Sequence, residues 1–77
     1  MGSETPTEEE EREFALIEAS RLIELGNLEF EQNNFGEALE NYEAALEISL
    51  SNDSPSGEAD TRYRIGAVHQ ERGEFSM

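Results

Sequence analysis

The chain has 77 residues, and its 19 acidic residues against five arginines give a formal net charge of −14, with no lysine and no cysteine. This length suits one small domain, whose single core leaves a net stability of only about 3–5 kcal/mol. The negative charge repels nucleic-acid phosphates and anionic lipids, so we expect neither nucleic acid nor a membrane as partner. Without cysteine, disulfides and thiolate metal sites are excluded.

The start of the chain is acidic and unlike a signal peptide, and no apolar run approaches the roughly 18 residues that a membrane span needs. We therefore expect a soluble, cytoplasmic protein. Residues 1–5 are interpreted as a disordered terminus or the scar of an expression tag, and residues 6–76 as one helical domain. A disordered acidic arm is the alternative for the glutamate-rich stretch that follows the terminus.

Capping signals predict where the first helix begins. Thr5 precedes Pro6, and Glu8 stands three residues after Thr5, which is a capping box with proline at the first helical position. The glutamates that follow favour the positive end of the helix dipole. Apart from one glycine, no breaker appears before Asn33 and Asn34, so we expect a helix of about 27 residues, roughly 40 Å long.

A second helix is predicted to begin after Asn34, with Glu37 at the reciprocal position of a capping box. One apolar face is indicated by helical spacing of Phe35, Ala38, Leu39, Tyr42, Ala45, Leu46 and Ser49. Four glutamates fall outside this stripe and are expected to face water: Glu37, Glu40, Glu43 and Glu47.

Residues 51–57 are rich in turn formers and predict a loop. Pro55 or Ser56 then begins a third helix that reaches about Arg72 and ends at Gly73. The very short link between the first two helices makes them antiparallel. The predicted fold class is therefore all-α, an antiparallel helical hairpin plus a third helix.

Two glycines interrupt these helices, where glycine costs about 1 kcal/mol relative to alanine. Gly26 and Gly66 lie 40 residues apart, each directly after a branched aliphatic residue, and the same offset places Asn33 over Gly73. Repeats of this length that are built from helix pairs are typical of solenoid units.

The first repeat carries a specific pattern of large, small and aromatic residues: Leu22, Leu25, Gly26, Phe35, Ala38, Tyr42 and Ala45. With this pattern the chain resembles the tetratricopeptide repeat (TPR) family. The resemblance implies about one and a half repeats of a TPR-like α-solenoid fragment, the first over about 19–52 and a partial second over about 59–76. It also implies that Gly26 and Ala38 let the two helices of a repeat approach closely, because no Cβ is tolerated where a neighbouring backbone crosses.

In this family the inner side of the first helix of each repeat lines a concave groove that binds an extended or helical peptide. Leu16, Ile23 and Phe30 recur every seven residues and form a second apolar stripe on the first helix. By resemblance, the expected peptide-binding groove consists of Ser20, Ile23, Glu24, Asn27, Phe30, Tyr63, Arg64 and Ala67. The alternative is that the stripe is core, packed against the N-terminal extension, the third helix or another subunit.

The resemblance implies a non-catalytic protein-interaction module. Some family members clamp a terminal carboxylate, and Asn27 matches one such position with Arg64 nearby, but the charge of −14 favours a basic or amphipathic peptide. Two alternatives stay open. One is a structural unit that forms a homo-oligomer through the exposed end of the truncated second repeat, and the other is an acidic mimic of nucleic acid.

No catalytic or metal-binding constellation stands out. His69, the single histidine, is expected to pack, because one histidine without cysteine cannot build a transition-metal site. Residues 52–57 alternate oxygen ligands, but Pro55 interrupts them and Tyr63 stands where a calcium loop needs its bidentate glutamate. We therefore predict no enzyme activity, no cofactor and no metal ion.

Overall fold

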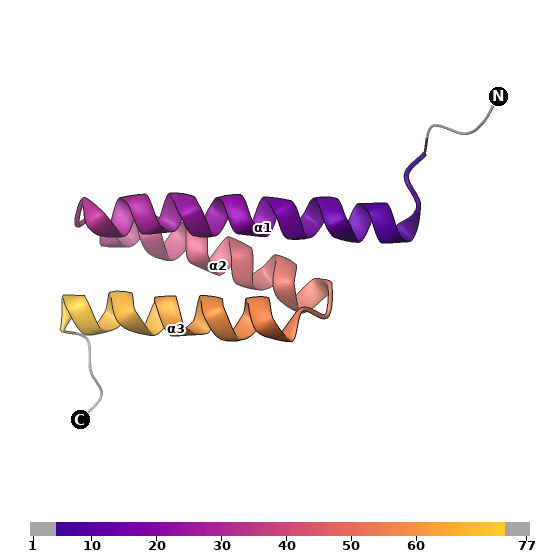
Figure 1. The fold of residues 1–77 in the computed structure, drawn as a ribbon. Coiled ribbons are helices and arrows are strands. Elements are labelled where there is room, and N and C mark those ends of the chain that lie inside the picture. Colours follow the sequence, from indigo (N-terminus) through magenta and orange to yellow (C-terminus); the bar gives the residue numbers. More distant parts are fainter. Residues whose placement is uncertain (1–4, 74–77) are drawn as a thin grey trace.

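The computed structural model describes residues 5–73, which form three helices (Figure 1). These are α1 (Glu8–Glu31), α2 (Phe35–Ser51) and α3 (Pro55–Arg72). The all-α prediction is confirmed. Most of the segment predicted as a terminus or tag scar, residues 1–4, lies outside the described residues, as does the end of the predicted domain at 74–76.

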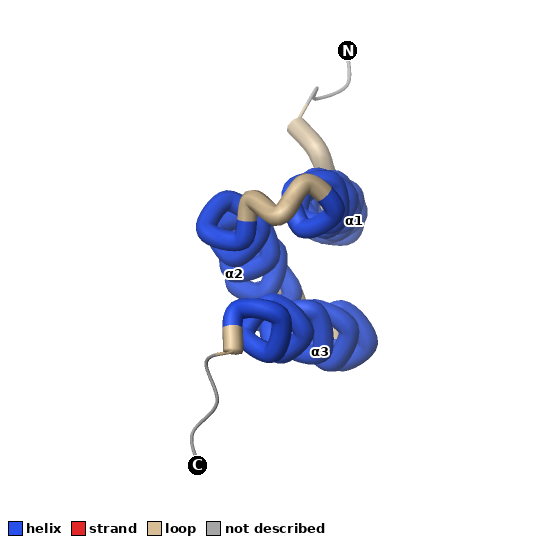
Figure 2. Tube along the Cα trace, turned by 90° about the vertical axis from the view of Figure 1, so that its left-hand side faces the viewer, coloured by secondary structure: helices blue, strands red, loops and turns tan. Residues whose placement is uncertain are grey.

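Consecutive helices run in opposite directions, so α3 runs in the same direction as α1 (Figure 1). Seen along the helices, α2 lies to one side and packs on both of its neighbours, whereas α1 and α3 touch each other at few positions (Figure 2). The predicted antiparallel hairpin is therefore present, and α3 continues the layer on the other side of α2.

The first helix begins two residues later than the sequence indicated. Thr7 is the N-cap: its Oγ1 accepts a hydrogen bond from the Glu10 backbone N–H at 3.1 Å, and Glu10 Oε1 accepts one from the Thr7 N–H at 2.9 Å. The box predicted for Thr5 and Glu8 is wrong, because the same Thr-x-x-Glu spacing recurs two residues on. This later start places four glutamates in the first turn of a 24-residue helix.

The turn between α1 and α2 contains one residue in the left-handed backbone conformation. Asn33 has φ 64°, and the Asn34 N–H donates to the Glu29 carbonyl at 2.8 Å, which closes the end of α1 as a Schellman motif does. Asn34 occupies the N-cap position of α2 as predicted, but its side chain donates to the Glu29 carboxylate instead of capping. The predicted box with Glu37 is therefore wrong.

The start and end of α3 agree with prediction. Pro55 is its first residue, and the Ser54 hydroxyl accepts a hydrogen bond from the Gly57 N–H at 3.4 Å. Gly73 ends the helix with φ 73°, a left-handed conformation that glycine adopts without steric cost.

The N-terminal turns of α1 reach the α2–α3 connection. Arg12 Nε donates to the Asn52 carbonyl at 3.0 Å, and its Nη2 donates to the Asp53 carbonyl at 3.3 Å. The Arg12 cation thus lies near the negative end of the α2 dipole. It ties the long first helix to the first two residues of the loop between α2 and α3.

The face of α2 predicted to be apolar is the one that packs. Its residues Ala38, Tyr42, Ala45 and Ser49 are buried, and Phe35, Leu39 and Leu46 are half-buried. The four glutamates outside the stripe are exposed, as predicted. Most of the buried side chains are small, so the helices approach closely and the packed layer is thin.

Gly26 lies where α1 meets the ring of Tyr42. A Cβ at Gly26 would stand 2.5 Å from Tyr42 Cε1 and 2.7 Å from Cδ1. The expected requirement for glycine is thus confirmed, but the neighbour is an aromatic side chain and not a crossing backbone. A Cβ at Gly66 would meet nothing within 4 Å, so the second glycine has no such contact within the described residues.

We expect Gly26→Ala to lower the free energy of unfolding by about 1–2 kcal/mol. Alanine gains about 1 kcal/mol of helix propensity, but overpacking against a ring that is only 2% exposed costs more. The control is Gly66→Ala, which gains the propensity without a clash and should raise the free energy of unfolding by up to about 1 kcal/mol. Urea unfolding compares the two, and equal shifts would refute the Tyr42 contact as the cause.

The contact between α2 and α3 contains buried hydroxyls. Thr61 Oγ1 donates to the Gly57 carbonyl at 2.6 Å, whereas Ser49 Oγ is buried and finds no hydrogen-bond partner within residues 5–73. A Cβ at Gly57 would stand 2.6 Å from that oxygen, so the start of α3 lies tightly against Ser49. An unpaired buried hydroxyl costs about 1–3 kcal/mol.

Ser49→Ala should therefore raise the free energy of unfolding by about 1 kcal/mol, because it removes the unpaired hydroxyl and favours the helix. Ser51→Ala, at an exposed position on the same helix, is the control and should change stability by less than about 0.5 kcal/mol. A loss of stability in Ser49→Ala, measured by urea unfolding, would show that the hydroxyl is paired in solution.

Candidate functional site

A pocket of about 360 Å³ lies where the three helices face one another. Its walls come from α1 and α3, and α2 contributes one ring at the back; the lining residues are Asn27, Phe30, Glu31, Tyr42, Tyr63, Arg64 and Ala67. Five of the residues predicted for the groove are among them: Asn27, Phe30, Tyr63, Arg64 and Ala67. The fold therefore brings residues from positions 27–30 and 63–67 to one place.

The other three predicted residues lie elsewhere. Ile23 is half-buried and packs with Phe30 against the core cluster of Ala38, Tyr42 and Val68. This cluster combines residues of α2 and α3, whereas the alternative predicted for the second stripe of α1 named the N-terminal extension, the third helix or another subunit. Ser20 and Glu24 are exposed on α1 and do not line the pocket.

Sequence reasoning missed two of the lining residues. Tyr42 is predicted on the apolar face of the second helix and is buried there, but it also lines the pocket. Glu31 follows Asn27 by four residues, a spacing that places both on one face of a helix. From this spacing alone, Glu31 could have been predicted to lie beside Asn27 at the groove.

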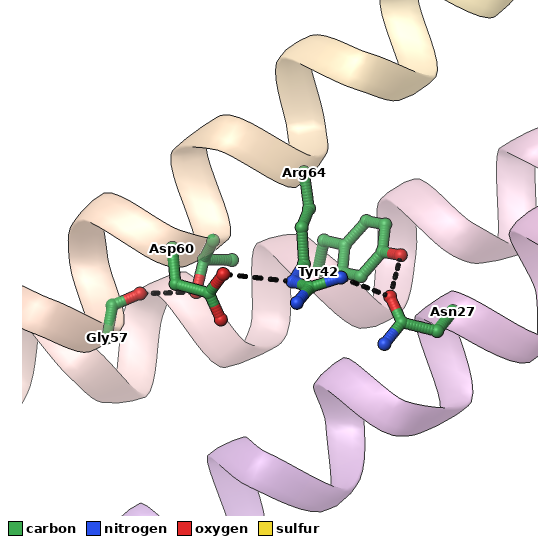
Figure 3. A network of polar contacts seen from close by, with 6 residues as sticks. Asn27, Tyr42, Gly57, Asp60 and Arg64 are labelled. Carbon is green, nitrogen blue, oxygen red and sulfur yellow. Dashed lines mark hydrogen bonds and ion pairs between the residues drawn. The ribbon is translucent and has the colours of Figure 1, made fainter.

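One amide joins the three helices (Figure 3). Asn27 Oδ1, on α1, accepts a hydrogen bond from Arg64 Nη1 of α3 at 2.9 Å and a second one from the Tyr42 hydroxyl of α2. Arginine can only donate, so the oxygen of the amide must face Arg64. The orientation of the Asn27 side chain is therefore determined by its neighbours.

Arg64 also pairs with a carboxylate of its own helix. Its Nε donates to Asp60 Oδ1 at 3.1 Å, one helical turn earlier on α3 (Figure 3). Glu31 is the other charged residue of the lining, and its side chain is exposed. The pocket therefore combines an arginine that is ion-paired with Asp60 and an exposed carboxylate.

Aromatic rings form the apolar part of the wall. Phe30 packs edge-on against Phe35, with ring centroids 5.6 Å apart and an interplanar angle of 65°, a favourable geometry for aromatic pairs. Tyr63, in contrast, is 77% exposed on the opposite wall. One ring is thus held by its neighbour, while the other presents most of its surface to water.

Burial raises the pKa of the Tyr42 hydroxyl above its ordinary value of 10.0, because desolvation disfavours the phenolate. The nearby positive charge of Arg64 acts in the opposite direction but is the smaller effect. The neutral phenol that donates to Asn27 is therefore the form that the folded chain stabilises.

This pKa shift predicts a loss of stability in base. Above about pH 10 the unfolded chain releases the proton that folded Tyr42 retains, so the free energy of unfolding falls as the pH rises. Below pH 10 the contribution is complete. Urea unfolding between pH 8 and 11 should show a steeper decline for the native chain than for Tyr42→Phe, in which Tyr63 remains as an internal reference. Parallel curves would contradict the shift.

Residues 5–73 contain no group of three or more His, Asp and Glu side chains that could hold a metal ion. Within the same residues no helix is long and apolar enough to cross a membrane. His69, expected to pack, is half-buried on α3.

A comparison with protein families gives a match to the SHNi-TPR family over residues 22–56. This segment is a TPR-type repeat. The TPR match begins in the second half of α1, includes all of α2 and ends in the first turn of α3. No curated protein and no solved structure gives a significant match. TPR-type repeats are generally non-enzymatic, and the matched segment suggests protein–protein interaction at a coarse level.

Proposed function

We propose that the pocket between α1 and α3 is the central part of a groove that binds a basic or amphipathic peptide of a protein partner. The observation that carries this proposal is the meeting of Asn27, Phe30, Tyr63, Arg64 and Ala67 around one pocket, although they come from two segments about 35 residues apart. The TPR-type repeat supports a protein partner in general.

The lining suits a peptide with one apolar anchor. Phe30, Tyr63 and Ala67 offer apolar surface on both walls, and aromatic surface is rich in binding energy at protein interfaces. Because the Asn27 oxygen already accepts two hydrogen bonds, its Nδ2 group is the part of the amide that remains for a ligand. That group can donate to a backbone carbonyl of the bound peptide.

Charge favours a basic peptide over an acidic one. The chain carries a net charge of −14, which attracts cations from a distance and speeds their encounter. Arg64 adds little repulsion, because Asp60 pairs with it. Glu31 stands at the rim as a partner for a lysine or arginine next to the anchor.

The exposed residues Ser20 and Glu24 extend the proposed groove along α1. Together with Asn27 and Glu31 they follow a spacing of three or four residues, which places them along one side of the helix. Ile23 belongs to the floor, because it packs on the core. In this arrangement a peptide runs beside α1 and inserts its anchor between the two helices.

A charge reversal tests the groove. We expect Glu31→Lys to weaken the binding of a lysine-rich peptide with one central leucine by about fivefold to tenfold, since a rim carboxylate and its partner contribute about 1 kcal/mol. Glu40→Lys makes the same change of net charge on the exposed face of α2. This control should change the Kd by less than about twofold, because screening weakens distant charges.

Changes in the backbone amide chemical shifts of the protein show where the peptide binds. Titration of the same peptide into 15N-labelled protein should shift the signals of Asn27, Phe30 and Ala67. Shifts confined to the outer glutamates of α2, or equal losses of affinity in the two charge-reversal variants, would refute the groove. Affinity that vanishes in high salt would instead favour non-specific attraction by the net charge.

A further inference from the structure

Both prolines of the chain directly follow a hydroxyl residue: Pro6 follows Thr5, and Pro55 follows Ser54. Pro55 is exposed at the first position of α3, and Ser54 lies before it in the connection 52–54 from α2. Ser54 has nonhelical backbone angles, φ −113° and ψ 87°, because proline disfavours the helical conformation in the residue before it. A serine on a connection, in front of an exposed proline, is the pattern that proline-directed protein kinases modify.

The start of α3 supplies donors for an anion. The Ser54 hydroxyl accepts a hydrogen bond from the Gly57 N–H at 3.4 Å, and the N–H groups in the first turn of a helix have no partner inside that helix. The helix dipole adds a partial positive charge at this end. A phosphate on the N-cap residue can therefore accept hydrogen bonds from the backbone of Ser56 and Gly57.

A buried donor lies beside the same turn. Ser49 is 1% exposed, and its Oγ has no hydrogen-bond partner within residues 5–73. A Cβ on Gly57 would lie 2.6 Å from this oxygen and 3.0 Å from Ser54 Oγ, so the hydroxyls of Ser49 and Ser54 flank one residue. The Ser49 hydroxyl is thus an unused donor close to the oxygen that would carry the phosphate.

A cation reaches this connection from another helix. Arg12 Nε donates to the Asn52 carbonyl at 3.0 Å and Nη2 to the Asp53 carbonyl at 3.3 Å, so the guanidinium lies against the two residues that precede Ser54. The start of α1 and the α2–α3 connection lie at the same end of the molecule (Figure 1). Arginine pairs with phosphate through strong, charge-assisted hydrogen bonds.

We propose that Ser54 is a phosphorylation site whose phosphate is held between the first turn of α3 and Arg12. In the transfer from ATP, the bond between the γ-phosphorus and its bridging oxygen breaks and a bond to Ser54 Oγ forms, while the hydroxyl proton passes to a base of the kinase and ADP leaves. The phosphate then links α3 to α1, which otherwise touch at few positions. This role does not depend on peptide binding in the groove.

Nearby carboxylates oppose the phosphate only in part. Those closest along the chain or around Arg12 are Glu8, Glu9, Asp53 and Glu58. Glu58 is paired with Arg62 at 3.0 Å, and the other three are exposed, so water and salt screen their charges. The backbone donors and the guanidinium contact the phosphate directly. We therefore expect the attraction to exceed the repulsion.

Phosphorylation of the full chain tests the site. After incubation with a mitogen-activated protein kinase and ATP, mass spectrometry should find phosphate on Ser54. Thr5 also precedes a proline and is exposed, so its modification reports that the kinase acts on this chain. Ser56→Ala removes a neighbouring exposed hydroxyl and should not prevent the modification. Absence of phosphate from Ser54 would overturn the proposal.

Amide hydrogen exchange tests how the phosphate is held. In a Thr5→Ala chain, phosphorylation of Ser54 should slow exchange of the Gly57 N–H about fivefold, as expected for one charge-assisted hydrogen bond. Arg12→Gln removes the cation and should reduce this ratio to about twofold. Arg21→Gln, which removes an exposed arginine from the same helix, is the control and should preserve the ratio. Faster exchange after phosphorylation, or an unchanged ratio in Arg12→Gln, would refute the proposed binding of the phosphate.

Discussion

The contact between the ring of Tyr42 and Gly26 determines the rest of the molecule. The ring occupies the space that a side chain at position 26 would need, and it is only 2% exposed. This contact sets the separation of α1 and α2, and it places the Tyr42 hydroxyl on the amide of Asn27. Asn27 in turn receives Arg64, so this close approach also positions the amide that links α3 to α1 and α2.

The same polar network serves stability and recognition. Asn27 holds Tyr42 and Arg64 through one oxygen, and Arg64 also pairs with Asp60. The carboxylate of Glu31 is an exposed charge of the pocket lining. A strongly acidic chain can therefore offer a pocket that is apolar in the middle and acidic at its edge, the arrangement that suits a basic partner with an apolar anchor.

Much of the fold is predicted by local sequence patterns, and the predictions that were wrong failed for local reasons. The spacing of the α2 residues correctly indicated the buried face, and Pro55 and Gly73 correctly marked the limits of α3. The start of α1 was misplaced because two Thr-x-x-Glu boxes overlap, and only the later one forms. Asn34 was expected to cap α2, but the carboxylate of Glu29, across the turn, captures its side chain.

Periodicity and turn chemistry within a few residues decide where each helix lies and which face is apolar, because they depend on backbone conformation and on neighbours one turn away. The TPR-like pattern also indicated that position 26 must be glycine. Only the packed structure shows that its neighbour is a ring, that Tyr42 joins the pocket, and that Gly66 faces open space. These facts depend on side chains from different helices meeting, and no local pattern records the distance between segments remote in sequence.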